Sequence, residues 1–476
     1  MASIALRTDI LPLVDATISA DPHQIIAVAR PLLEQDGRAA ELIGRIGMIA
    51  AHGDSEGHTI LMLDAASILS RWIDELPLVL GEEQQSFARA LPLLVQALVA
   101  AAPAVRAGNS AQNSYPEPFF PSDLSEGQTV SARMHDAIYG NDADMVERLL
   151  FGLYGSGADY RTMQIRSYDG ISTTFENAGH PLMFAVRGTQ LLDTVEWGDR
   201  VPNILHWLSP HLTVHSEEPT WVKTVRSFLS DPHHSLESYR IRLAFPKDEN
   251  ALPLRQLVLS NSDTPQICQG VYDALMNNGA SSHAIGSVIA LAATDLMQRV
   301  GDDDRDAFIR AAHGLLFASA VRLAFREIQD IEALPLLFTS AAFINALSKE
   351  LEAQSNTAQK TATHSNILGG GLIAPALLDT LREQLDVRDL AGAYSTARRY
   401  LQLGYDARGL FATIALVSAL ADASNDMGHT WQVVQAAGEE LISWPSTLSG
   451  TNIEGFVHVA LRSAAFAQRN TLVNNV

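Results

Sequence analysis

The chain has 476 residues, which is too long for one ordinary domain and predicts two or more packed modules. Hydrophobic residues make up 47% of the sequence and charged residues 18%, so a large core can form and disorder is disfavoured. The formal net charge of −21 argues against nucleic acid or an anionic membrane as a partner, and favours neutral or cationic ligands.

The residue types favour helices over sheets. Aromatic residues are only 7% of the chain, while Ala and Leu, which suit close-packed helices, are abundant. One cysteine, Cys268, excludes an intramolecular disulfide and is expected to be a small core residue. Residues 1–15 lack the pattern of a signal peptide, and apolar stretches such as residues 90–105 are shorter than a membrane span, so we expect a cytoplasmic protein.

The first predicted unit, residues 1–106, sets a pattern that returns later in the chain. Asp36 is expected at a helix start, and a polar turn then leads to Gly57-His58 and a helix over residues 59–72. A further apolar helix is expected over residues 87–99. Residues 107–127, rich in Asn, Pro, Ser and Phe, predict an ordered loop to the next unit.

The second unit covers residues 128–253. Gly157 suits a helix end and Asp159 the cap of the next helix, which leads to Gly179-His180 and a helix over residues 181–195. The following helix contains His206. Residues 214–253 predict a mixed connection, the one place where some sheet is expected.

The third and fourth units, residues 254–349 and 372–476, follow the same order of signals. Asp263 leads to His283 and a helix over residues 284–300, and Asp406 leads to His429 and a helix over residues 430–443. The next helices contain His313 and His458 respectively. Residues 350–371, polar and then Gly-rich, predict a mobile linker or lid between the two units.

The spacing of these signals predicts an internal repeat. The four Asp-to-His separations are 22, 21, 20 and 23 residues, in the order of the chain. We therefore predict an all-α fold of four diverged helical repeats, built from helical hairpin pairs and packed around a shared interior.

Seven of the 15 histidines fall on this pattern. Imidazole is the commonest protein ligand of transition metals and binds them in its neutral form, which a helix N-terminus favours. The pattern thus predicts metal ligands at the starts of third helices and within fourth helices: His58, His180, His283, His429, His206, His313 and His458. The same placement also suits a structural role, because a ring at a first helical position can cap or pack against the preceding turn.

Carboxylates near these histidines have two interpretations. Glu176 and Asp426 lie shortly before a repeat histidine, where each suits either a hydrogen-bond partner of the ring or a helix-start charge. Asp64 is less ordinary, because it falls in the middle of an apolar helix. Gly369-Gly370-Gly371 lacks the following Lys-Ser/Thr of a phosphate loop, so no nucleotide site is predicted.

One stretch resembles a known family. Gly179-His180 followed by Ala185, Leu191 and Leu192 resembles the His-containing helical region that accompanies some bacterial Rieske-type iron–sulfur proteins, as does the Gly404-Tyr405-Asp406 turn. A single cysteine cannot supply the two Cys-x-His pairs of the cluster. The resemblance implies a stand-alone His-rich helical domain linked to redox chemistry, and a similarity of type extends to questin-oxidase-like helical oxygenases.

These observations lead to one functional hypothesis and two alternatives. The leading prediction is a metal-dependent oxidoreductase, with non-haem iron as the transition metal, acting on a small organic substrate in a His-lined interior. A redox protein is a further possible partner. The alternatives are a non-catalytic helical repeat scaffold that binds a partner protein, and a metal-free enzyme with a His general base.

Overall fold

A computed structural model describes residues 9–34, 38–76, 89–111, 114–195, 197–242, 246–301, 304–327, 330–354 and 373–469. These residues form α-helices and short helical turns, with no β-strand among them. The prediction of an all-α fold is therefore confirmed for the described part of the chain.

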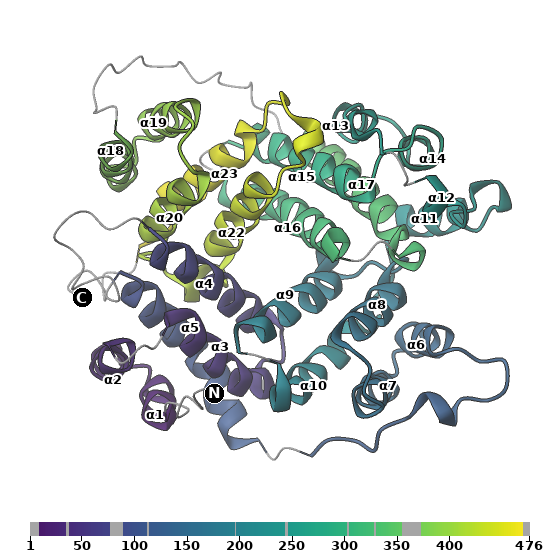
Figure 1. The fold of residues 1–476 in the computed structure, drawn as a ribbon, viewed down its shortest axis with the longest axis horizontal. Coiled ribbons are helices and arrows are strands. Elements are labelled where there is room, and N and C mark those ends of the chain that lie inside the picture. Colours follow the sequence, from purple (N-terminus) through teal and green to yellow (C-terminus); the bar gives the residue numbers. More distant parts are fainter. Residues whose placement is uncertain are drawn as a thin grey trace, which may run out of the picture.

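Four helices surround the centre of the molecule: α4 (His58–Asp74), α9 (His180–Thr194), α16 (Arg305–Glu327) and α22 (His429–Ile442). Each contacts the next, and α22 contacts α4 again, so the four helices close into a ring (Figure 1). We call them the inner helices. Segments far apart in the sequence thus meet around one interior.

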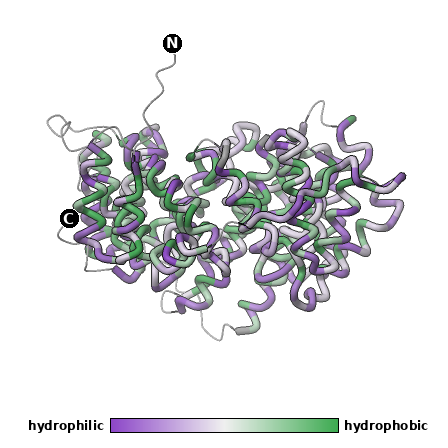
Figure 2. Tube along the Cα trace, turned by 90° about the horizontal axis from the view of Figure 1, so that it is seen from below, coloured by the Kyte–Doolittle hydropathy of each residue, from purple (hydrophilic) through white to green (hydrophobic). Residues whose placement is uncertain are grey.

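A second layer packs two helices against each inner helix. These helices are α3 (Ala39–Ala50) and α5 (Leu91–Ser110), α8 (Tyr160–Ile171) and α10 (Val201–Leu212), α15 (Ser282–Arg299) and α17 (Pro335–Gln354), and α20 (Ala407–Ser418) and α23 (Glu454–Phe466). Apolar and polar positions alternate along the helices (Figure 2), and the buried apolar side chains form one continuous core.

The remaining helices lie at the periphery or form short connections in Figure 1. They are α1 (Leu11–Ser19), α2 (Pro22–Glu34), α6 (Val130–Tyr139), α7 (Ala143–Gly155), α11 (Thr220–Leu229), α12 (Tyr239–Arg242), α13 (Leu254–Leu257), α14 (Thr264–Tyr272), α18 (Ala374–Asp386), α19 (Leu390–Gln402) and α21 (Ala423–Asp426).

Three of the four predicted aspartate caps lie where expected. Asp159, Asp263 and Asp406 are the N-caps of α8, α14 and α20, and each carboxylate accepts a hydrogen bond from a backbone N–H of the first turn. Asp36 falls outside the described residues. These caps therefore set where α8, α14 and α20 begin.

Three predicted connections differ from the structure. Helix α5 continues through Ser110, so the loop expected from residue 107 starts later. Residues 214–253 contain α11, α12 and helical turns rather than sheet, in their described part. Helix α17 extends through Gln354, and the rest of the linker predicted over residues 350–371 falls outside the described residues.

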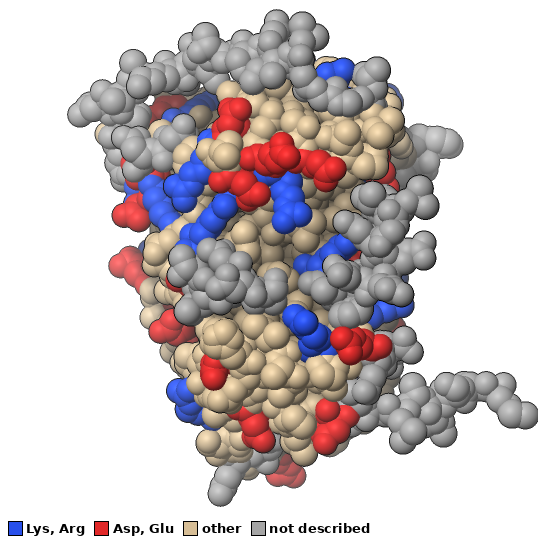
Figure 3. All heavy atoms as spheres, turned by 90° about the vertical axis from the view of Figure 1, so that its left-hand side faces the viewer, with Lys and Arg blue, Asp and Glu red and all other residues tan. Residues whose placement is uncertain are grey.

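The expectation that apolar stretches fall short of a membrane span was too strict. Three helical stretches, Leu91–Ser110, Arg305–Arg326 and Ile331–Ala353, are long and apolar enough to cross a membrane by length and composition. In this structure 67–78% of the most apolar 18-residue segment of each stretch is buried inside the protein. On the side face in Figure 3, acidic and basic side chains are interspersed with uncharged residues.

Candidate histidine centre

Three inner helices begin with a histidine that directly follows a glycine. Gly57, Gly179 and Gly428 have φ of +81°, +86° and +74°, and His58, His180 and His429 are the first residues of α4, α9 and α22. A side chain is strained at such φ values, so glycine is the residue that suits these turns. The Gly-His pair therefore directs the chain into each inner helix.

Close packing explains a second need for glycine at these turns. A Cβ atom on Gly57 would come within 2.4 Å of Phe184, and one on Gly179 within 2.3 Å of Phe317. A Cβ atom on Gly428 would come within 2.6 Å of Met62. Each contacted side chain lies four residues after the histidine of the neighbouring inner helix, so the turns repeat one packing arrangement around the ring.

Helix α16 departs from this arrangement. It begins at Arg305, about two turns before His313, and therefore brings His313 to the centre from within the helix. The four imidazoles form a closed circuit, with ring centroids 4.9 Å apart for His58 and His180, 5.2 Å for His180 and His313, 5.0 Å for His313 and His429, and 6.1 Å for His429 and His58. We call these four residues the histidine centre.

Backbone carbonyls fix the tautomer of three of these rings. Nδ1 of His180 faces the carbonyl of Asn177, Nδ1 of His429 that of Asp426, and Nδ1 of His313 lies 2.9 Å from that of Ile309. A carbonyl only accepts, so each Nδ1 carries the proton and donates it. In the neutral ring Nε2 then has a free lone pair, which is the form that binds a metal.

Burial favours the neutral form of three of the four rings. It lowers the pKa of His180 to about 3 and that of His313 to about 4, and the neighbouring imidazoles add to both shifts. Burial and His429 also lower the pKa of His58, against the opposing effects of Asp54 and Glu56. At neutral pH the rings of His58, His180 and His313 are therefore uncharged.

The closest approach is between His313 and His429, whose Nε2 atoms lie 3.3 Å apart. With both protons on Nδ1, two lone pairs face each other across this distance. A cation between them, either a proton or a metal ion, would turn that repulsion into attraction. Two nitrogens bound to one ion at about 2.1 Å stand roughly 3.0–3.4 Å apart between square-planar and tetrahedral angles.

The centre is not arranged as a finished metal site. Within the described residues, no group of three or more His, Cys, Asp or Glu side chains is already placed to hold a metal ion. The nearby carboxylates have other partners: Asp426 accepts from Gly428 and Thr430, and Asp54 from the backbone N–H of Ile60. Any shared ion would draw the imidazoles closer together.

The other predicted ligands lie elsewhere. His283 is in the first turn of α15, outside α16, where burial and the charge of Arg322 lower its pKa. His206 Nδ1 lies 2.6 Å from a carboxylate oxygen of Glu147, which raises its pKa. The ring of His458 packs against Tyr394 at 5.6 Å.

One histidine near the centre was not predicted. His211, in α10, packs against Phe184 at a centroid distance of 4.7 Å, and the ring of Phe184 also contacts those of His58 and His180. Burial lowers the pKa of His211, with Asp54 opposing the shift. It falls outside the repeated Gly-His pattern, so no spacing in the sequence indicated it. Cys268, as expected, is a buried free thiol.

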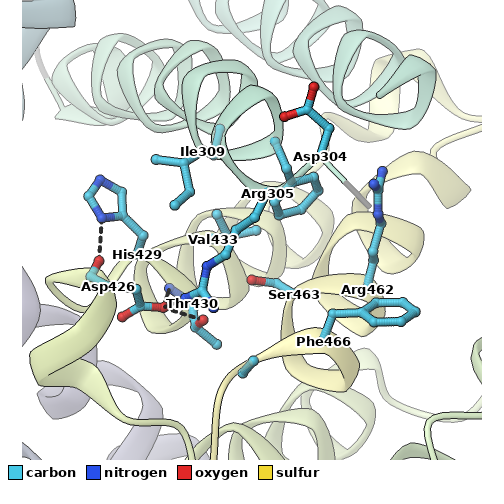
Figure 4. Close-up of a pocket in the computed structure, with 13 residues that line it drawn as sticks. Asp304, Arg305, Ile309, Asp426, His429, Thr430, Val433, Arg462, Ser463 and Phe466 are labelled. Atoms are coloured by element: carbon cyan, nitrogen blue, oxygen red, sulfur yellow. Dashed lines mark hydrogen bonds and ion pairs between the residues drawn. The ribbon is translucent and has the colours of Figure 1, made fainter. Parts of the chain in front are cut away.

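A pocket of about 150 Å³ reaches His429 from outside the ring (Figure 4). Its walls are the extra N-terminal turns of α16, the start of α22, and the end of α23, and its apolar lining includes Phe308, Ile309, Val433 and Phe466. At the other three junctions a Gly-His turn covers the next inner helix. The early start of α16 replaces that turn here and leaves space beside His429.

Further along the ring interior lies a buried polar network. Asp64 of α4 is fully buried and accepts a hydrogen bond of 2.9 Å from Gln435 of α22. Arg187 of α9 donates to Glu439 at 2.8 Å and lies 3.9 Å from Asp64. Burial outweighs these partners and raises the pKa of Asp64 to about 7. The mid-helix aspartate noted in the sequence thus joins three inner helices.

This shift predicts a pH-dependent effect of Asp64→Asn. The pKa of this carboxyl is higher in the folded protein than in the unfolded chain. Its contribution to stability is therefore present at low pH and is lost as pH rises from about 4 through about 7. Since asparagine does not ionise, the variant should gain free energy of unfolding relative to the parent between pH 5 and pH 8.5. Urea denaturation at several pH values measures this difference, and a difference independent of pH would contradict the account of Asp64.

Comparisons with known proteins gave no relative: no family model, no curated protein and no solved structure matches the chain. Nothing in them links it to the Rieske-associated helical regions, so that resemblance stays a prediction, and the histidine centre itself supplies the argument about function.

Proposed function

We propose that the histidine centre binds one transition-metal ion and that the protein is a metal-dependent oxidoreductase for a small organic substrate. The observation that carries this proposal is the 3.3 Å approach of the Nε2 atoms of His313 and His429, both with Nδ1 donating to a backbone carbonyl. His180 is held in the same tautomer, and His58 completes the circuit of rings. A cation between the facing Nε2 lone pairs would attract both rings, and in this proposal a metal ion is that cation.

The donor set favours certain metals. Imidazole nitrogens suit iron, copper, zinc and nickel, whereas calcium and magnesium prefer oxygen ligands. We take iron as the first candidate because the resemblance to redox proteins points to it. The bound metal would supply the redox chemistry, while the backbone carbonyls hold the rings in their ligating form.

The pocket beside His429 supports the second half of the proposal. It offers a route by which a molecule outside the ring can approach the histidine centre, since His429 belongs to both (Figure 4). Its apolar walls exclude water from one side of a bound molecule. A small organic substrate fits this combination.

The fourfold packing supports a proposed origin of the ring. We propose that the chain consists of four diverged repeats, each contributing one inner helix. Three share the Gly-His turn, whereas the third contributes α16 and reaches the centre with His313. The predicted assignment of α15 as the equivalent helix is replaced in this proposal, because α15 packs outside α16.

Metal content tests the proposed function. Protein purified without chelators from cells supplied with iron, copper, zinc and nickel should contain about one transition metal per chain by elemental analysis. A chelator-treated sample should take up one equivalent again. A protein that neither carries nor takes up any of these metals would contradict the proposal.

The same pair of histidines supports a second candidate. If a single proton lies between His313 and His429, the pair becomes a metal-free general base beside the pocket. Metal-free protein would then be fully active and chelators without effect. The scaffold alternative with histidines spread along an open solenoid is disfavoured, because the inner helices close on each other.

A further inference from the structure

The lining of the pocket beside His429 combines apolar and charged side chains. Toward the ring it is lined by Ile309, Ala312 and Val433, which are apolar. Its solvent-exposed side carries Asp304 and Arg305, at the start of α16 (Figure 4). A ligand that matches the pocket therefore has an apolar body and one polar end.

Three of the four charged side chains that line the pocket already have hydrogen-bond partners. Asp304 accepts from the backbone N–H of Ala307, and Asp426 from Gly428 and Thr430. Arg462 donates to the carbonyls of Met297 and Gly301, and its guanidinium lies 4.6 Å from the ring centroid of Phe308. These three side chains therefore form their hydrogen bonds with other groups of the protein.

Arg305 differs from them. Its guanidinium lies 3.5 Å from the Asp426 carboxylate, its side chain makes no hydrogen bond to any described residue, and 42% of that side chain is exposed. The Asp426 carboxylate already accepts three hydrogen bonds, so the guanidinium of Arg305 keeps donors for another partner. A planar fork of N–H donors at the mouth of an apolar pocket suits a carboxylate.

The size of the pocket limits the apolar body. A cavity of 150 Å³ in another protein holds one benzene molecule, and the pocket here measures about 150 Å³. The pocket therefore accommodates one six-membered ring or a branched aliphatic group of similar volume. The acidic charge of the whole chain does not oppose this locally, because salt screens distant charges and the lining balances Asp304 and Asp426 with Arg305 and Arg462.

We infer that the substrate is a small monocarboxylate with a single-ring or similar apolar body, whose carboxylate binds Arg305 while its body points toward His429. As a statement about substrate this rests on the proposed oxidoreductase function. As a statement about binding it rests on the pocket alone.

Calorimetric titration with benzoate and benzamide tests the inference, in both metal-free and metal-loaded protein. The two probes have the same size, and only benzoate is charged. Arg305→Gln should weaken benzoate about fivefold or more, the low end for a charged hydrogen bond because the guanidinium is partly exposed, and leave benzamide unchanged. Arg310→Gln, on the same helix outside the pocket lining, is the matched control and should change neither.

A second variant keeps the test decisive. Ser463→Leu adds volume inside the pocket and should weaken both probes, with circular dichroism to confirm that the fold persists. Benzoate binding that is absent, or unaffected by Arg305→Gln, overturns the inference even if metal is present. Arg305-dependent binding in a protein that takes up no metal keeps the binding site and rejects the oxidoreductase.

Discussion

Replacing Glu440 with alanine should lower the free energy of unfolding by about 3–5 kcal/mol, the cost of leaving a buried charge without its partner. Glu440 of α22 accepts a hydrogen bond of 2.7 Å from Nε of Arg322 in α16, and both side chains are fully buried. Burial raises the pKa of Glu440, and Arg322 opposes that shift. Without Glu440, the Arg322 guanidinium would stay buried with its nearest counter-charge removed.

The double replacement Arg322→Met and Glu440→Leu separates this cause from simple loss of packing. Removing both charges should recover most of the stability, since apolar residues of similar volume can replace a buried ion pair. The exposed pair Lys223–Glu217 is the matched control, and Glu217→Ala should cost about 0–1 kcal/mol. Chemical denaturation measures all three. A double variant no more stable than Glu440→Ala would contradict the charge argument.

The largest functional effects are expected at the histidine centre. His313→Ala should reduce metal affinity by more than about a hundredfold, because loss of a hydrogen-bond partner of a ligand alone costs about 10–100-fold. His58→Ala, His180→Ala and His429→Ala should act similarly. Helical content should persist in each, since the inner helices retain their apolar contacts.

His283→Ala supplies the discriminating control. His283 shares the predicted spacing with the other helix-start histidines but lies on α15, outside α16. Its replacement should leave metal stoichiometry unchanged, as should His206→Ala and His458→Ala. Competition against a chromophoric chelator measures each affinity. Equal losses in His283→Ala and His313→Ala would contradict the assignment of the centre.

The sequence was informative where local chemistry decides the structure. The Gly-His pairs at residues 57–58, 179–180 and 428–429 mark turns with positive φ, and three predicted aspartates are helix caps. Both signals depend on a few adjacent residues. They placed three of the four central imidazoles at helix starts before any contact between helices was known.

In the proposed four-repeat arrangement α16 takes the place that the sequence pattern assigned to α15, and there is a physical reason why the sequence could not distinguish the two helices. Helices α15 and α16 are both rich in Ala and Leu and contribute buried side chains on all sides. A helix buried all round has no amphipathic stripe to show which of the two faces the centre. The two-turn extension of α16 before His313 is likewise a matter of packing between helices.

The polar network around Asp64 could not be predicted from the sequence, for a different reason. Asp64 was unusual in an apolar helix, but its partners Arg187 and Gln435 lie 123 and 371 residues away in the chain. No periodicity connects residues at such separations. The pairing follows from closure of the ring, which brings α4, α9 and α22 together around the interior.

X-ray absorption at the metal edge of the metal-loaded protein tests the central claim most directly. The account predicts one ion per chain with three or four imidazole nitrogens at about 2.0–2.2 Å, and loss of one imidazole contribution in His313→Ala but not in His283→Ala. A spectrum with only oxygen ligands, or one unchanged by His313→Ala, would contradict metal binding at the histidine centre.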